Sequence, residues 1–361
     1  MVRINKEKIE ERFEESQNSL VLQSSDFSLQ GLREMVESNI IDLTPKYQRR
    51  ERWGVDRQSE LIESFLLNIP VPPIYLAEEE YGIYSIIDGK QRITATADFL
   101  SNSFKLRKLE SFPELNGLKF RELPPPLQNA LRIRPYFRVI TLLKQSKPEL
   151  KYEVFLRLNR GGIRLNNQEI RNVAFRGHLN DAIYECAEND FLRSALNISG
   201  SKSAAYQQMQ DAELVLRFLM LKEKWQNFSG SFSRSMDKFM IEKAHIDQDK
   251  SIQLASSFDE AITRVADLWG EHAFERWDGK KWRKQALAGL YDAQMIAAHE
   301  LSDTHFQALK GKQKEILDRT KMLFTNDSFE EAVRLGTNTP SRMKYRVEMI
   351  KSELLNLAGL Q

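Results

Sequence analysis

The segment 85–96, SIIDGKQRITAT, places charged side chains at the junction of a predicted strand and a predicted helix. The helix begins within DGKQR at 88–92, directly after a glycine. The N–H groups at a helix start and the positive end of the helix dipole favour an anion, and glycine allows close approach of the backbone. This pattern predicts a phosphate site in which Lys90 and Arg92 supply positive charge, and Asp88 holds a metal ion or orients water.

A structural role for the same segment is equally consistent with its spacing. Asp88 is followed three positions later by Gln91, which is nearly a capping box. Ile93, Ala97 and Leu100 have the spacing of a helix face that packs into a core. Spacing alone therefore leaves both interpretations open.

A second segment, 155–172 (FLRLNRGGIRLNNQEIRN), carries a double glycine between polar residues, ahead of a predicted helix. Asn159 precedes the glycines, and Glu169 and Asn172 follow them, so polar groups could converge on a ligand at this loop. Alternatively, Asn166 and Glu169 form a capping box, and the segment is an ordinary capped helix with solvated arginines.

A third segment, 47–53 (YQRRERW), mixes arginines with two aromatic residues in a predicted loop. Guanidinium groups bind phosphates and aromatic rings stack on bases, so the loop is a candidate contact for nucleotide or nucleic acid. A solvated loop anchored by Trp53 explains the same composition equally well.

Short apolar runs around these segments predict the elements that position them. Predicted strands, short and rich in branched or aromatic residues, lie at 71–77, 84–87 and 137–143. Predicted helices lie at 5–19, at 28–37 after Ser28, after an N-cap at Asp56, at 90–100 and after Pro148.

Beyond about residue 178 the strand signals disappear and helical spacing dominates. The predicted fold class is therefore α+β. We expect a helical arm at 1–21, a small mixed-sheet domain at 22–178 and an all-helical domain at 179–361.

Composition narrows the setting of the protein. Lys and Arg number 53 against 51 Asp and Glu, so the net charge of +2 gives no overall nucleic-acid footprint. The single cysteine, Cys186, excludes a disulfide framework and suits a reducing compartment, which predicts a cytoplasmic protein. The charged N-terminus and the absence of a long apolar run argue against secretion and membrane insertion.

Taken in order, YQRRERW, YSIIDGKQRIT and FLRLNRGGIRLNNQEIRN resemble the N-terminal domain of GmrSD-type restriction endonucleases. This is a family of ParB-like and sulfiredoxin-like domains whose hallmark is Asp-Gly-Gln-Gln-Arg. Lys90 replaces the first glutamine of that hallmark here. The resemblance covers roughly residues 30–178, and extends weakly to DAELVLRFLML at 211–221 and FSRSMDKFM at 232–240.

The resemblance implies a module of a prokaryotic DNA restriction or anti-phage defence system that binds and hydrolyses a nucleoside triphosphate with Mg²⁺. The implied catalytic residues are Asp88, Gln91, Arg92 and Glu169, with Asp88 also a metal ligand through the Mg²⁺–nucleotide. The implied nucleotide-binding residues are Gln48, Arg49, Gly89, Lys90, Thr94, Asn159, Arg171 and Asn172.

Within this set, the residue types indicate individual roles. Arg92 and Arg49 would stabilise developing charge, and Glu169 would act as base. Gln48, Asn159 or Asn172 would position the attacking water. DNA is an expected partner, and a separate nuclease subunit and a second copy of the chain are candidate partners.

Family members usually add an HNH-type nuclease domain, but this chain lacks a clear one. Of its five histidines only His245, in KAHIDQD, faintly resembles such a motif. Sulfiredoxin activity is disfavoured because the DGKQR turn has no cysteine and Cys186 lies in a predicted helix. Two rival functions stay open: a non-enzymatic, ParB-like DNA-binding adaptor, and a metal-dependent DNA nuclease in its own right.

Overall fold

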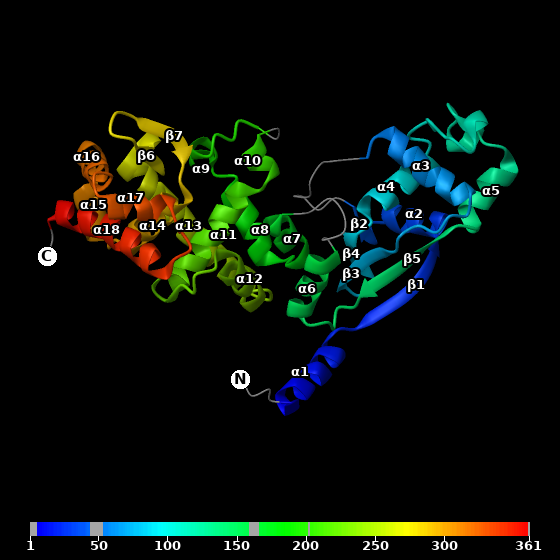
Figure 1. The fold of residues 1–361 in the computed structure, drawn as a ribbon, viewed down its shortest axis with the longest axis horizontal. Coiled ribbons are helices and arrows are strands. Elements are labelled where there is room, and N and C mark those ends of the chain that lie inside the picture. Colours follow the sequence, from blue (N-terminus) through cyan, green and yellow to red (C-terminus); the bar gives the residue numbers. More distant parts are fainter. Residues whose placement is uncertain (1–5, 44–52, 159–165, 201–202, 360–361) are drawn as a thin grey trace. The chain divides into compact units, whose positions relative to one another are not determined.

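The computed structural model describes residues 6–43, 53–158, 166–200 and 203–359 (Figure 1). Contacts between Cα atoms divide the chain into two compact units, which we call unit 1 (1–165) and unit 2 (166–361). The division precedes residue 178, where the sequence places the start of the helical domain. Helix α7 (Asn167–Ala174) therefore lies in unit 2.

Unit 1 contains a five-stranded mixed sheet in the order β1-β5-β3-β4-β2. Its strands are β1 (Leu22–Ser28), β2 (Ile41–Asp42), β3 (Ile74–Glu80), β4 (Ile83–Asp88) and β5 (Tyr136–Leu142). β3 and β4 form an antiparallel hairpin, β3 runs parallel to β5, and β2 runs parallel to β4. β1 closes the other edge, antiparallel to β5.

The described helices of unit 1 bury apolar side chains in its core, except for the first, which is exposed apart from Ser19. They are α1 (Lys6–Ser19), α2 (Leu29–Glu37), α3 (Val55–Leu66), α4 (Lys90–Leu100), α5 (Pro125–Ile133) and α6 (Pro148–Leu158), with 3₁₀ turns at Pro113–Leu115 and Phe120–Glu122. The core joins Leu32, Phe65 and Phe99 from three of these helices to Ile74 and Phe137 of the sheet. Burial of these apolar side chains fixes the position of α4 directly behind β4.

Three local predictions for unit 1 need correction. The strand predicted at 71–77 begins only at Ile74, because prolines cannot donate to a strand ladder, and it continues through the acidic residues to Glu80. The N-cap of α3 is Gly54 rather than Asp56, which lies in the first turn and pairs with Lys108 at 2.6 Å. Strands β1 and β2 had no clear signal, since both lie at sheet edges where few apolar residues are needed.

Unit 2 is largely helical. Its helices are α7, α8 (His178–Ala187), α9 (Asp190–Ala195), α10 (Ala204–Gln207), α11 (Gln210–Lys224), α12 (Phe232–Glu242), α13 (Gln248–Trp269), α14 (Ala288–Glu300), α15 (Asp303–Leu309), α16 (Gln313–Leu323), α17 (Asp327–Arg334) and α18 (Pro340–Ala358). Short 3₁₀ turns follow α11 at Trp225–Asn227 and α13 at Gly270–His272. Helix α14 is buried from Gly289 to Ala298 and packs against α11, α13 and α18, so it is the central helix of the unit.

The prediction of an all-helical second domain is wrong in one place. Strands β6 (Glu275–Trp277) and β7 (Trp282–Ala286) form a hairpin in which Trp277 pairs with Trp282. The turn between them contains Asp278 and Gly279, a sequence typical of tight hairpins, and Gly279 has φ 91°. The two strands were not predicted, because charged residues fill most of this short hairpin and leave no alternating apolar pattern. The α+β class is confirmed by the mixed sheet of unit 1 and the helices of unit 2.

Candidate functional site

The DGKQR turn joins the end of β4 to the start of α4, as predicted. Asp88 is the last residue of β4, and Gly89 is the N-cap of α4 with φ 100°. A Cβ atom on Gly89 would lie 2.9 Å from Cγ1 of Ile74, so this position requires glycine for both its backbone conformation and its space. The backbone of the turn therefore lies directly against Ile74 of β3.

The N-cap residue of α4, Gly89, has no side chain with which to cap the helix. The predicted alternative, a capping box between Asp88 and Gln91, is wrong because Gly89 takes the N-cap position. The dipole of α4 is thus not complemented by an acidic group in its first turn, which is the arrangement that favours a bound anion.

Arg92 folds back over the turn and is held from two sides. Its Nη2 donates to Oδ2 of Asp88 at 2.8 Å and to the carbonyl of Pro73 at 3.0 Å. The Arg92 side chain is 14% exposed, whereas that of Asp88 is 46% exposed. The guanidinium group is therefore fixed in place, and the carboxylate beside it stays open to solvent. The contribution of Pro73 escaped prediction because it comes from the loop before β3.

Gln91 links the turn to the arginine-rich loop. Its Oε1 accepts a hydrogen bond from the backbone N–H of Trp53 at 3.1 Å, and the guanidinium of Arg57 lies 4.5 Å from the Trp53 ring centroid. Trp53, the last residue of the segment 47–53, is half-buried against the core of unit 1, as the predicted anchoring role requires. Gln48 and Arg49, predicted in the same loop, lie outside the described residues, and so does Asn159. Lys90 and Thr94 lie on α4 and are half-buried.

The predicted residues of α7 lie in unit 2, and the capping alternative for them is confirmed. Oδ1 of Asn166 accepts from the N–H of Glu169 at 2.8 Å, and Oε2 of Glu169 accepts from the N–H of Asn166 at 2.6 Å. Both bonds satisfy backbone donors at the start of α7. Glu169 is buried, so its observed role is to stabilise this helix end.

Arg171 and Asn172 have internal partners as well, so the predicted solvated arginine is wrong for Arg171, which is fully buried. Nε of the fully buried Arg171 donates to Oδ1 of Asp237 at 2.7 Å, and its Nη2 donates to Oγ of Ser233 at 3.2 Å. Oδ1 of the buried Asn172 accepts from Nδ2 of Asn180 at 2.8 Å. These contacts are structural within unit 2, and a role of these side chains toward nucleotide stays a prediction.

The described residues contain no group of three or more His, Cys, Asp and Glu side chains suited to a metal ion. The residues of the DGKQR turn nevertheless fit a Mg²⁺–nucleotide, since Asp88 is half-exposed and only its Oδ2 is bonded to Arg92. Mg²⁺ commonly takes one or two carboxylates and receives its other ligands from phosphate and water. We therefore expect a metal ion to bind at this turn together with nucleotide phosphates and water, because the described side chains of the turn supply too few ligands by themselves.

The remaining cysteine and histidine candidates are separate from the turn. Cys186 is buried in α8, and desolvation raises the pKa of its thiol to about 12, which makes it the inert core residue expected. His245 lies in the turn after α12. Trp277 and Trp282 of the β6–β7 hairpin pack together with ring centroids 5.5 Å apart, and both are half-buried.

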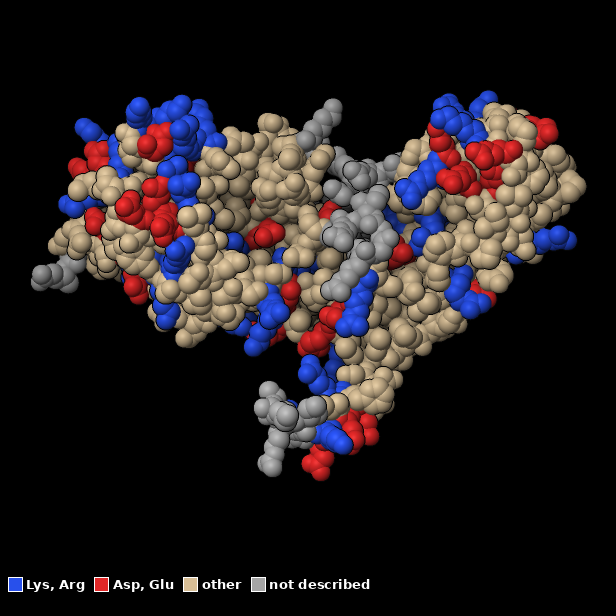
Figure 2. Space-filling view, viewed as in Figure 1, with Lys and Arg blue, Asp and Glu red and all other residues tan. Residues whose placement is uncertain are grey.

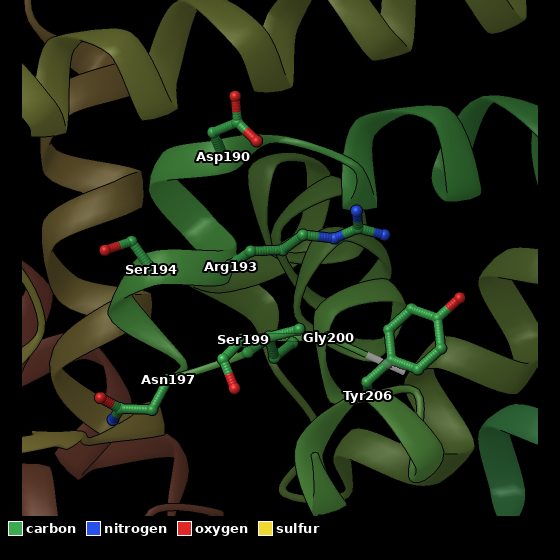
Figure 3. Close-up of a pocket in the computed structure, with 8 residues that line it drawn as sticks. Asp190, Arg193, Ser194, Asn197, Ser199, Gly200 and Tyr206 are labelled. Atoms are coloured by element: carbon green, nitrogen blue, oxygen red, sulfur yellow. The ribbon is translucent and has the colours of Figure 1, made fainter. Parts of the chain in front are cut away.

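A hollow of about 800 Å³ lies between α9 and α10 in unit 2 (Figure 3). Arg193 extends from α9, with its guanidinium carbon 5.6 Å from the ring centroid of Tyr206. That guanidinium also makes two hydrogen bonds to the carboxylate of Glu188, at 2.6 and 3.1 Å. Oδ2 of Asp211 lies 3.8 Å from its Nε as well, so two carboxylates face this one guanidinium and the hollow is not the preferred anion site.

Charges of both signs are interspersed on the visible face of each unit (Figure 2). This distribution agrees with the near-neutral net charge and makes individual turns, rather than a broad surface, the place to look for anion binding. Among the described helices, none combines the length and the apolar character that crossing a bilayer requires.

Fold and turn together define a mixed α+β domain with an open helix start behind a glycine. Residues 32–176 match the family model described as GmrSD restriction endonuclease, N-terminal domain. The resemblance predicted from the three motifs is thereby confirmed over this segment, which contains the DGKQR turn and α7. No curated protein and no solved structure matches the chain.

Proposed function

We propose that this chain is a module of a prokaryotic DNA restriction or anti-phage defence system that binds and hydrolyses a nucleoside triphosphate. The family match supports the restriction context. The observation that carries the nucleotide role is the start of α4, where the N-cap is a glycine, the first turn has no acidic residue, and Arg92 is held in place by Asp88. The phosphates would lie at this helix start.

The charges around the turn favour phosphate. Lys90 and Arg92 contribute two positive charges against the single negative charge of Asp88. Arg92 is already oriented by two hydrogen bonds, so it needs little rearrangement to stabilise charge that develops on a transferring phosphoryl group. We assign that role to Arg92, together with Arg49 of the neighbouring loop.

Mg²⁺ would enter with the nucleotide and neutralise part of the phosphate charge. The free side of the Asp88 carboxylate is the protein ligand available to it at this turn. Gln91 would act by holding Trp53 near the start of α4. Water positioning by Gln48, Asn159 or Asn172 and base catalysis by Glu169 rest on the family resemblance alone, since the printed contacts of Glu169 and Asn172 are structural ones within unit 2.

The test is phosphate release from ATP, GTP, CTP and UTP with Mg²⁺, with and without DNA. We expect turnover that Asp88→Ala abolishes and that Arg92→Ala lowers about 10²- to 10³-fold, the usual effect of removing one charge-stabilising group. The DNA arm also tests the coupling of nucleotide state to DNA. The proposal includes a separate nuclease subunit that responds to the nucleotide state of this chain. It also places the protein in the cytoplasm.

Arg33→Ala is the matched control for Arg92→Ala. Arg33 pairs with Glu37 one helical turn away at 2.7 Å and donates to the carbonyl of Leu100 at 3.3 Å, which reproduces both contacts of Arg92. This variant should hydrolyse nucleotide at the wild-type rate. Equal losses in the two variants, or undiminished hydrolysis in Arg92→Ala, would remove the site from α4. A wild-type chain without turnover that binds DNA in a salt-sensitive way would support the ParB-like adaptor instead.

A further inference from the structure

A cavity of about 390 Å³ in unit 2 lies between the starts of α11 and α14. Its apolar walls include Leu196, Leu214 and Tyr291, and its charged lining residues are Glu213 and Arg217 of α11. The volume is within the range of small-molecule sites, which are mostly apolar with a few fixed polar groups. The cavity is far in sequence from the DGKQR turn and belongs to unit 2 alone.

Arg217 is 8% exposed and its guanidinium is held rigidly. Nε and Nη2 each donate to the carboxylate of Asp292 at 2.6 Å, and the guanidinium carbon lies 3.4 Å from the ring centroid of Phe232. Nη1 makes no hydrogen bond to any residue in the described part of the chain, and it is not among the fully enclosed polar atoms. Since Arg217 lines the cavity, a rigidly held and buried charged group with one nitrogen outside the Asp292 pair borders it.

The charges behind Arg217 do not balance. Asp292 also accepts from Nη2 of Arg346 at 2.6 Å, so one buried carboxylate serves two buried guanidinium groups. Burial lowers the pKa of Arg346, Asp292 opposes that effect, and the positive charge of Arg217 adds to it. The buried trio of Arg217, Arg346 and Asp292 keeps one excess positive charge, and Glu213 of the cavity lining, one helical turn from Arg217, is the negative charge that offsets it.

The start of α14 contributes to the same cavity through Ala286, Leu287 and Ala288. The N-cap is Leu287, no side chain of the described residues caps this helix, and its first turn has no acidic residue. By contrast, α11 has Asp211 and Glu213 in its first turn. Ala288 lies one helical turn before Asp292, and therefore on the helix face that holds Arg217.

We propose that this cavity binds a small organic anion, whose phosphate or carboxylate group lies between the start of α14 and Nη1 of Arg217. The apolar body of the ligand would pack against Leu196, Leu214 and Tyr291. Glu213, one turn before Arg217, adds a negative charge to the lining, which selects against highly charged ligands. The site is independent of the nucleotide site proposed at α4.

The test titrates phenyl phosphate, inorganic phosphate and phenol into the full chain by calorimetry. Phenyl phosphate should bind more tightly than either of the others, because only it has both the charge and the apolar body. Ala288→Asp places a competing carboxylate at the exposed first position of α14 and should weaken phenyl phosphate binding about tenfold or more, with a small rise in Tm. Ala288→Asn is the neutral control of the same size and should bind as the wild type does.

Glu213→Gln provides a change of opposite sign, since removal of the like charge should tighten phenyl phosphate binding about two- to fivefold. Equal binding by Ala288→Asp and Ala288→Asn, or no preference for phenyl phosphate over inorganic phosphate, would overturn the assignment. Asp88→Ala should leave this binding unchanged, so failure here and failure of the nucleotide proposal are distinguishable.

Discussion

Helices α4 in unit 1 and α7 in unit 2 both begin after segments rich in charged and amide residues, and both were candidates for nucleotide contact. At α4 the N-cap is a glycine, and the nearest carboxylate, Asp88, bonds to Arg92 instead of to the helix backbone. At α7 the side chains of Asn166 and Glu169 bond to the backbone and close the helix end. The first start stays open to an anion, and the second is already satisfied.

The two arginines differ in the same way. Arg92 pairs with a half-exposed carboxylate at the surface of the turn. Arg171 is fully buried and its hydrogen bonds join α7 to Asp237 and Ser233 of α12. Similar residue types therefore hold a binding turn ready in one place and hold two helices together in the other. The difference lies in whether the polar groups are used up inside the protein.

The largest expected effect is on stability and concerns these two arginines. Arg171→Ala leaves Asp237 without its buried partner and should lower the free energy of unfolding of unit 2 by about 3–5 kcal/mol. Arg92→Ala should cost unit 1 at most about 1 kcal/mol, because its partner is half-exposed. Urea unfolding followed by tryptophan fluorescence reports mainly on unit 2, which contains Trp225, Trp269, Trp277 and Trp282, because Trp53 is the one tryptophan of unit 1.

Hydrogen exchange of α4 peptides provides the corresponding measurement of the stability of unit 1 in Arg92→Ala.

Asp237→Asn is the milder variant at the buried pair, because it keeps a hydrogen-bond acceptor for Arg171. Its free energy of unfolding should lie between those of the wild type and Arg171→Ala. If Arg92→Ala destabilises its unit as much as Arg171→Ala does, the distinction between a binding turn and a structural one fails.

A second, intermediate effect is expected at the glycine of the open turn. Gly89→Ala must adopt a φ of 100° and bring its Cβ to 2.9 Å from Ile74, so it should destabilise unit 1 by about 1–3 kcal/mol. Gly117→Ala is the control, because Gly117 has φ 88° with no atom near the added Cβ. The difference between the two variants measures the close approach alone, and equal costs would show that Ile74 gives way.

The smallest expected change in stability comes from a variant that gives α4 an acidic residue in its first turn, as Glu169 does for α7. Lys90→Glu should stabilise α4 by about 0.3–1 kcal/mol through the helix dipole, and should weaken nucleotide binding by repelling phosphate. Lys90→Gln, which restores the family hallmark, removes the charge without adding an opposite one and should lie between. Thermal unfolding and nucleotide titration should therefore move in opposite directions; if Lys90→Glu strengthens binding, phosphate does not lie at this helix start.

Much of unit 1 was predictable because its signals are local. The strand at 137–143, the helix after the DGKQR turn and the cap at Ser28 follow from apolar runs and from residues within one helical turn, and all three are present. The edge strands and the β6–β7 hairpin were missed, since edge and surface strands bury too little for a strong pattern. The strand predicted at 71–77 begins only at Ile74, because the prolines before it have no N–H to donate to the sheet.

The sequence by itself determined the mixed α+β class, the family resemblance over 32–176 and the strand–glycine–helix geometry of residues 88–92, because each depends on short-range pattern. Only the tertiary structure decided which polar groups remain available. The contacts of Arg92 with Pro73, of Arg171 with Asp237, and of Arg217 with Asp292 join residues distant in sequence. Whether a charge is exposed, paired or left in excess depends on such long-range neighbours, which no local spacing specifies.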